Sequence, residues 1–131
     1  MPNVGVIDAG LPISWMRAHH PRLRQMERLF SASKSGNLDL VISVVNLAEV
    51  LIHTVDIRRK AGVDAVALLL ASRVRIHHPD EETARRVAVL STSLAGGFAV
   101  ATAQQLGARL HTTDRALVRQ IRSTRIPVTQ Y

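Results

Sequence analysis

The chain alternates short strand-like runs with longer segments in which apolar residues recur at helical spacing. The strand-like runs are rich in Val, Ile and Leu and cover residues 3–8, 38–43, 73–77, 109–112 and 126–129. Short apolar runs of this kind favour strands buried on both faces of a parallel sheet. The run 73–77 instead alternates, with Val74 and Ile76 on one side of the predicted strand.

Between these runs the spacing of apolar residues predicts helices. The predicted helices cover 11–18, 21–34, 44 to about 60, 63–71, a segment opened by residues 79–82, 93–106 and 116–122. Ser43 is a suitable N-cap for the third of them, and Gly107 ends the sixth. Strands alternating with helices are typical of a parallel α/β sheet. We therefore predict one α/β domain over residues 1–131, with about five parallel strands flanked by helices.

Composition narrows the class of protein. A chain of 131 residues with 47% hydrophobic residues suits one domain with one core. The lack of cysteine excludes disulfides and thiolate metal sites. No apolar run is long enough to span a membrane, and no signal-peptide pattern is present, so we expect a soluble, cytoplasmic protein. The glycine motifs of nucleotide-binding loops are also missing.

The charge is strongly basic. Seventeen Lys and Arg oppose ten Asp and Glu, for a formal net charge of +7, and all but Lys34 and Lys60 of the basic residues are Arg. Arg forms bidentate contacts with phosphate, so the excess is compatible with a nucleic-acid substrate or an acidic protein partner. It is equally compatible with an Arg-rich proteome. Only 3% of residues are aromatic, which argues against a base-stacking platform.

Three carboxylates lie at positions where an α/β sheet places its ligands. Asp8 ends the first strand, Asp114 follows the fourth, and Glu49 lies in an apolar stretch about two turns into the helix after the second. The carboxyl ends of parallel strands share one edge, so these acids can converge there. Taken singly, an Asp after a strand is also an ordinary turn or N-cap residue. Together they would repel one another unless a cation such as Mg²⁺ or Mn²⁺ joined them, and such a cation activates water for attack on a phosphodiester.

Four segments resemble the PIN-domain ribonucleases, in particular the VapC toxins of bacterial type II toxin–antitoxin modules. They are residues 6–9 (VIDA), 43–50 (SVVNLAEV), 93–103 (SLAGGFAVATA) and 106–115 (LGARLHTTDR). The resemblance covers nearly the whole chain and rests on the order and spacing of the segments. It implies a PIN-like fold and a Mg²⁺- or Mn²⁺-dependent endoribonuclease acting on RNA. It also implies a homodimer that a cognate antitoxin holds inactive by covering the acidic cleft.

The same resemblance assigns roles to individual residues. The family's first Asp falls on Asp8, its Glu on Glu49 and its last Asp on Asp114, as catalytic residues and metal ligands. The hydroxyl residue that often precedes the last Asp corresponds to Thr112 or Thr113, as support near the metal.

One family acid is missing from this chain. The Asp of the third family motif falls on Gly96, and no Asp or Glu occurs from Thr83 to Thr113. Changes in the outer shell of a metal site typically cost about 10- to 100-fold in metal affinity or activity, so we expect an impaired enzyme. The chain is either a naturally degenerate homologue or carries a change made or selected so that a toxic nuclease could be produced.

The basic residues near these acids give weaker indications. Arg115, beside Asp114, could meet a phosphate at the cleft mouth, or could be a surface residue at a helix N-terminus. The six histidines show no zinc-binding spacing. We interpret His53 and His111 as rim or partly buried residues rather than ligands.

A second function from another class fits the same sequence. The chain could be a non-catalytic PIN-like module that binds RNA or an antitoxin through its Arg residues and dimer surface, without cleaving anything.

Overall fold

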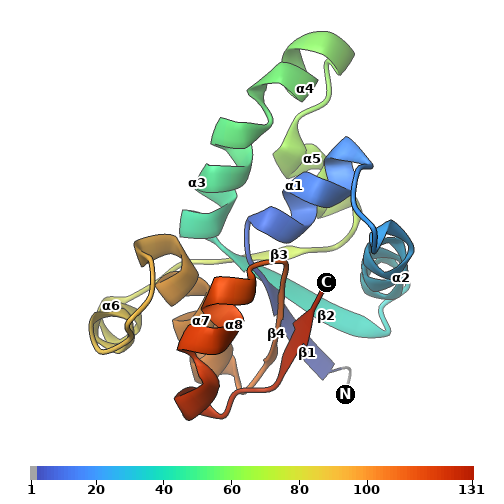
Figure 1. Cartoon of the computed structure of the whole chain (residues 1–131). Coiled ribbons are helices and arrows are strands. Elements are labelled where there is room, and N and C mark those ends of the chain that lie inside the picture. The colour runs from blue at the N-terminus through green and yellow to red at the C-terminus, as the bar shows by residue number, and fades with distance from the viewer. Residues whose placement is uncertain (1–2) are drawn as a thin grey trace.

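A parallel sheet forms the centre of the molecule (Figure 1). The computed structural model describes residues 3–131. The strands are β1 (Asn3–Ile7), β2 (Leu38–Ser43), β3 (Arg75–His77), β4 (Arg109–Thr112) and β5 (Val128–Gln130). All neighbouring pairs are parallel, in the order β3-β2-β1-β4-β5. The predicted α/β class and five-stranded parallel sheet are therefore confirmed, and the first strand lies at the middle of the sheet.

Helices cover both faces of this sheet. They are α1 (Gly10–Arg17), α2 (Leu23–Lys34), α3 (Val44–His53), α4 (Val55–Ala61), α5 (Ala65–Ala71), α6 (Glu81–Ala88), α7 (Leu94–Leu106), α8 (Arg115–Gln120) and the 3-10 turn η1 (Arg122–Thr124). Side chains alternate across β1, so Ile7 packs with α1, α2, α3 and α5 while Val6 packs with α7 and α8. Because both faces are covered, β1 and β2 have apolar, buried runs at residues 6–7 and 40–42.

The long helix predicted to run from residue 44 to about 60 is broken in two. The Thr54 hydroxyl donates to the Val50 carbonyl oxygen at 2.6 Å, and the Thr54 backbone leaves the helical region at φ −121°. A new helix, α4, starts at Val55. No helix within the described residues 3–131 is long and apolar enough to cross a membrane.

Close packing explains the glycine pair in the helix of small residues. Gly97 is buried on α7, and a Cβ added there would lie 2.9 Å from both Thr92 Oγ1 and Val87 Cγ1. The missing side chain therefore lets α6 and the loop after it approach the α7 backbone. Since α7 also packs against β1 and β4, α6 fixes the position of the helix that carries Gly96.

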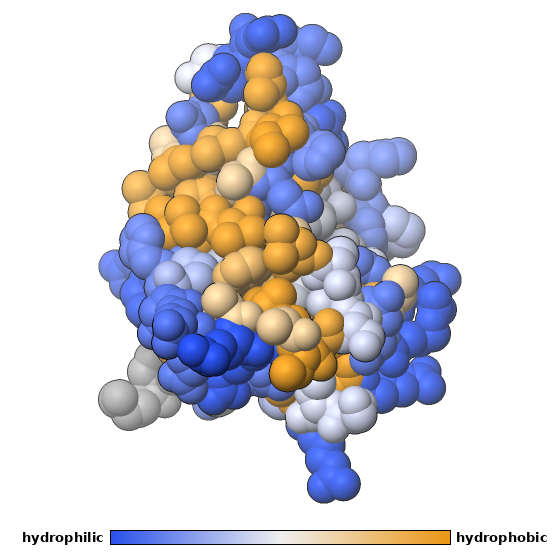
Figure 2. Space-filling view, turned by 90° about the vertical axis from the view of Figure 1, so that its left-hand side faces the viewer, coloured by the Kyte–Doolittle hydropathy of each residue, from blue (hydrophilic) through white to orange (hydrophobic). Residues whose placement is uncertain are grey.

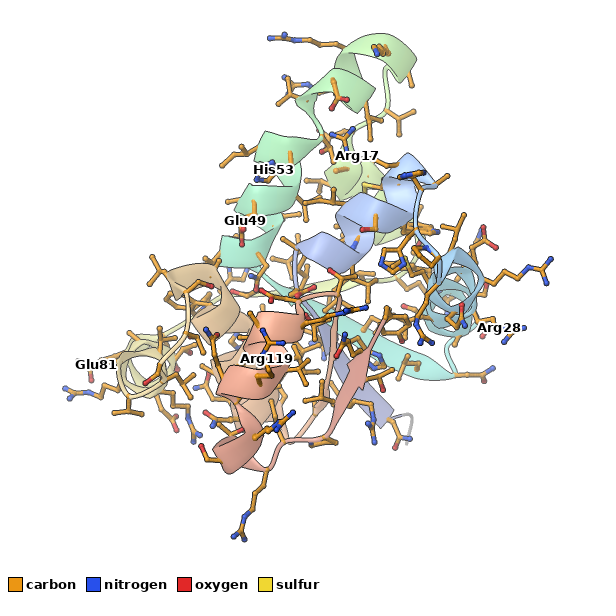
Figure 3. The ribbon with its side chains drawn as sticks, viewed as in Figure 1. Arg17, Arg28, Glu49, His53, Glu81 and Arg119 are labelled. Atoms are coloured by element: carbon orange, nitrogen blue, oxygen red, sulfur yellow. The ribbon has the colours of Figure 1, made fainter. Side chains whose placement is uncertain are left out.

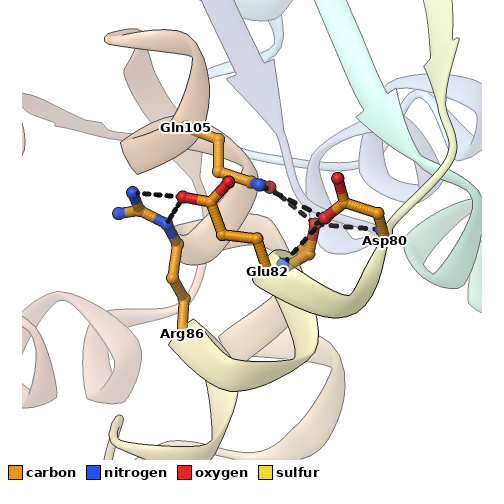
Figure 4. A network of polar contacts seen from close by, with 5 residues as sticks. Asp80, Glu82, Arg86 and Gln105 are labelled. Carbon is orange, nitrogen blue, oxygen red and sulfur yellow. Dashed lines mark hydrogen bonds and ion pairs between the residues drawn. The ribbon is translucent and has the colours of Figure 1, made fainter.

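A polar network holds the start of α6 against α7 (Figure 4). Asp80 Oδ1 accepts from the Thr83 backbone N–H at 3.0 Å, and the Thr83 hydroxyl accepts from the Asp80 N–H at 3.1 Å. This reciprocal pair forms a capping box. The Thr83 hydroxyl also lies 2.6 Å from Gln105 Oε1 on α7. On the outer face of α6, Glu81 forms an ion pair with Arg85, and Glu82 forms one with Arg86.

We predict that Thr83→Val destabilises the protein by about 1–3 kcal/mol, because its fully buried hydroxyl serves both Asp80 and Gln105. Urea unfolding followed by circular dichroism measures the change. A double-mutant cycle with Gln105→Ala checks the cause, since coupled partners give non-additive losses. Additive losses would show that the hydroxyl and Gln105 act independently.

Candidate active site

The carboxyl edge of the sheet carries a cleft of about 550 Å³, and the three predicted acids lie on it. Asp8 follows β1, Asp114 follows β4, the strand beside β1, and Glu49 reaches the same space from α3. Gly96, in the first turn of α7, lines the same cleft. Figure 3 shows Glu49 and His53 on successive turns of α3. Four positions far apart in the sequence are thus brought together.

Asp8 is the buried acid of the group, with 7% of its surface exposed. One carboxylate oxygen accepts from the Leu11 N–H at 3.3 Å, and the other accepts from the Thr112 hydroxyl. Burial raises the pKa of Asp8 to about 6, and the charges of Asp114 and Glu49 add to this rise, while the two hydrogen bonds oppose it. The fold therefore keeps this carboxyl group in a buried position that disfavours its charged form.

Thr112 links two of the acids. Its fully buried hydroxyl donates to Asp8 and accepts from the Asp114 N–H at 2.9 Å. Asp114 in turn caps α8, since its Oδ1 accepts from the Leu117 N–H at 3.0 Å. Asp114 is therefore both an N-cap and a cleft residue. Thr113 also lines the cleft, with its hydroxyl against Gly10, where an added Cβ would lie 2.5 Å from Oγ1.

The space beside Gly96 is already filled. A Cβ added there would lie 2.9 Å from Ser93 Oγ and 3.0 Å from Leu117 Cδ1. Ser93 is the N-cap of α7, and its hydroxyl accepts from the Gly96 N–H at 3.2 Å. The position of the missing acid therefore borders the cleft, and neighbouring side chains occupy the volume that its Cβ would need.

Other cleft residues escaped the sequence analysis. Arg17 lines the cleft from the last turn of α1. Asn46 is buried one turn before Glu49; its Nδ2 donates to the Ala95 carbonyl at 3.0 Å, and its Oδ1 has no partner among the described residues. The three-residue spacing from Glu49 was a usable signal for Asn46, because such residues share a helix face.

Two further basic residues lie elsewhere. Arg115 is exposed at the start of α8 and is not among the residues that line the cleft. His111 is buried away from the cleft lining, with Nδ1 2.8 Å from the Tyr131 hydroxyl. Burial lowers the pKa of His111 to about 4, and the Arg109 charge adds to this effect, so the ring is neutral. His53, by contrast, is an exposed residue of the cleft lining, as expected for a rim position.

The donor chemistry of the cleft fits a hard divalent cation. Three carboxylates and the orphaned Asn46 Oδ1 offer only oxygen, which Mg²⁺ and Mn²⁺ prefer. Their side chains are not drawn together: within residues 3–131, no group of three or more His, Cys, Asp or Glu is arranged to hold a metal ion. Glu49 is only half-buried. The metal site thus stays a prediction, supported by donor type and by the shared cleft.

Comparison with known proteins identifies the fold. No family model matches the chain, and no curated protein matches its sequence. Among solved structures, it is similar to a toxin–antitoxin complex from Klebsiella pneumoniae, with 17% identity and a TM-score of 0.69 over 97% of this chain and 98% of that one.

Two further solved structures give the same result. VapC20 of Mycobacterium tuberculosis, described as a sarcin-ricin loop cleaving toxin, has 16% identity and a TM-score of 0.66 over 88% and 93% of the two chains. VapBC2 of Rickettsia felis, bound to a promoter DNA fragment, has 16% identity and a TM-score of 0.67 over 98% of each. The chain therefore has the PIN-like fold of VapC toxins.

We predict that Asp8→Asn stabilises the protein at pH 7.5 in the presence of a chelator. The pKa of Asp8 is raised from 3.8 to about 6 on folding, so its contribution to stability is complete below about pH 4 and is lost as the pH rises through 6. The shift corresponds to roughly 3 kcal/mol, an upper limit for the gain at pH 7.5. Chemical unfolding at pH 4 and 7.5 measures it. An equal effect at both pH values would contradict the assigned cause.

Proposed function

We propose that this chain is a VapC-like endoribonuclease that hydrolyses RNA phosphodiester bonds with Mg²⁺ or Mn²⁺. The observation that carries the proposal is the convergence of Asp8, Glu49 and Asp114 on one cleft at the carboxyl edge of a PIN-like sheet. The RNA substrate is supported by the similar fold of VapC20, whose description names sarcin-ricin loop cleavage. The basic character of the chain, with a net charge of +7, suits a polyanionic substrate.

In this proposal the three carboxylates would hold the cation, which when bound neutralises phosphate charge and lowers the pKa of a bound water. The protein's part is to fix the oxygens. Asp8 is oriented from two sides by the Leu11 N–H and the Thr112 hydroxyl. The Thr112 hydroxyl also accepts from the Asp114 N–H, so one hydroxyl group connects the two acids. Glu49, half-buried on α3, would supply a further oxygen.

The absence of an acid at position 96 is proposed to impair this reaction. Mg²⁺ can be held by one or two carboxylates and several waters, so Asp8, Glu49 and Asp114 are ligands of a suitable type and number. The open arrangement of the three side chains agrees with weak binding. We expect metal affinity at least about tenfold below that of a site with four acids.

A protein partner is also proposed. Figure 2 shows apolar side chains gathered across the middle of one face, with hydrophilic ones around them. On this side lie α3, α6 and α7. Exposed large apolar residues on or next to these helices are Val44 and Ile52 on α3, Val89 after α6 and Leu94 on α7, and we name these four residues the apolar face. Exposed apolar patches mark protein contacts. Since similar folds occur in toxin–antitoxin complexes, we propose that the apolar face contacts a cognate antitoxin and that the chain forms a homodimer. We also propose that the protein acts in the cytoplasm.

The second candidate is a binding module without catalysis. It is favoured by the lack of a gathered metal-binding group within residues 3–131, together with the apolar face. Such a module would bind RNA or an antitoxin and cleave nothing.

We predict that the purified chain cleaves structured RNA when Mn²⁺ is added, and that Glu49→Gln reduces the rate at least 100-fold. The reason is loss of a charged ligand from a half-buried position, with little effect on folding. Glu82→Gln on α6 is the control, because that acid is paired with Arg86 outside the cleft. Absence of cleavage in the wild-type chain, with RNA or antitoxin binding unchanged by Glu49→Gln, would establish the binding module instead.

We further predict that Gly96→Asp raises Mn²⁺ affinity about tenfold or more and increases RNA cleavage. The Cβ must displace a Leu117 methyl, which is the end of a flexible side chain, and Ser93 Oγ, which caps α7 through the Gly96 N–H. Calorimetric titration with Mn²⁺ measures the affinity. Gly96→Asn is the matched control, since it has the same shape without the charge. Equal affinities for the Asp and Asn variants would contradict the placement of the missing acid.

A further inference from the structure

Arg17 differs from the other basic residues in its position. It is the only Arg or Lys among the described residues that line the cleft with the three acids. Its side chain is 41% exposed and lies at the end of α1, where it reaches toward α4 (Figure 3). A nuclease cleft lined by carboxylates repels phosphate, so a fixed cation at its rim has a clear use.

The guanidinium group of Arg17 is held in one orientation. Nη1 and Nη2 donate to the two carboxylate oxygens of Asp56 at 3.1 and 3.0 Å, and Nη2 also donates to the His53 carbonyl oxygen. These contacts use three of the five N–H donors of an Arg. Nε–H and the second Nη1–H make no hydrogen bond with the described residues. They lie on opposite sides of the guanidinium group, so each is a separate donor for a phosphate oxygen.

The helix break at Thr54 creates this anchor. Because α3 ends at His53, the carbonyl of that residue lies at the helix C-terminus, where carbonyl groups lack intrahelical partners and the dipole is negative. The new helix then places Asp56 in its first turn, facing the same guanidinium. The break therefore supplies both acceptors that fix Arg17 at the edge of the cleft.

A purely structural link between α1 and α4, formed by the Arg17–Asp56 ion pair and here called a strap, is a poor explanation for this arrangement. Both partners are about half exposed, and ion pairs of that kind contribute little to stability. Arg75 and Asp39 form a similar bidentate pair on β3 and β2, away from the cleft. The chain thus offers a natural comparison in which the same pair lacks access to the acids.

We propose that Arg17, positioned by Asp56 and the His53 carbonyl, binds a phosphate of the RNA strand at the mouth of the cleft. This assignment rests on the proposed function, since it names how the same site holds its substrate. Arg17 would contribute a charge-assisted hydrogen bond to a non-bridging phosphate oxygen through one of its two remaining N–H groups. It takes the role that the sequence analysis gave to Arg115.

The test measures binding of a short fluorescein-labelled single-stranded RNA by anisotropy, in a chelator that prevents cleavage, over a series of salt concentrations. Arg17→Ala is expected to weaken binding about tenfold at low salt and to reduce the slope of log K against log salt by about 0.7. Arg75→Ala is the matched control and should leave the slope close to the wild-type value. Asp56→Ala should keep the wild-type slope, because the positive charge remains.

The possible results separate the two proposals. Unchanged binding and slope in Arg17→Ala, with equal losses of thermal stability in Arg17→Ala and Asp56→Ala, would establish a strap and overturn the assignment. Equal losses of binding in Arg17→Ala and Arg75→Ala would reduce the effect to overall charge and also overturn it. A selective effect of Arg17→Ala in a chain that fails to cleave RNA with Mn²⁺ would support the phosphate site while rejecting the nuclease.

Discussion

The burial of Asp8 is the constraint on which the site depends. A carboxyl group at the end of the central strand loses its hydration. Burial, with a smaller contribution from the charges of Asp114 and Glu49, raises its pKa to about 6 although two hydrogen bonds oppose the rise. The surrounding elements each supply part of the compensation: α1 gives the Leu11 N–H, β4 gives the Thr112 hydroxyl, and Thr112 also fixes Asp114. Groups held in costly positions by a rigid scaffold are typical of functional sites. The fold therefore holds at the cleft one buried carboxyl group whose ionisation is disfavoured.

The first turn of α7 shows a different adjustment. A Cβ on Gly97 would lie 2.9 Å from Val87 Cγ1 and Thr92 Oγ1, and a Cβ on Gly96 would lie 2.9 Å from Ser93 Oγ and 3.0 Å from Leu117 Cδ1. Both glycines are therefore closely packed. Gly97 allows the approach of α6, whereas Gly96 borders the cleft.

Much of this could be predicted from the sequence because parallel strands have a simple signature. Strands covered on both faces are rich in apolar residues, so β1 and β2 were evident, and acids at strand ends predicted where Asp8 and Asp114 would meet. The break at Thr54 could not be predicted, because no Gly or Pro marks it in the sequence. Arg17 was missed because its place on the cleft depends on Asp56, 39 residues away, and on the new helix direction. Arg115 is next to Asp114 in sequence, but adjacency does not place it on the cleft.

The charge of the whole chain differs from the charge of the side chains that line the cleft. The chain carries a net charge of +7, yet the cleft lining includes three carboxylates and a single Arg. A basic surface attracts RNA over a distance, but near the reacting bond the local acids oppose the phosphate. Two devices can resolve this conflict, a divalent cation among the acids and a fixed guanidinium at the rim. In the proposed nuclease, a site with three carboxylates would hold the cation less firmly than a site with four, and the charge of Arg17 would then carry a larger share of substrate binding.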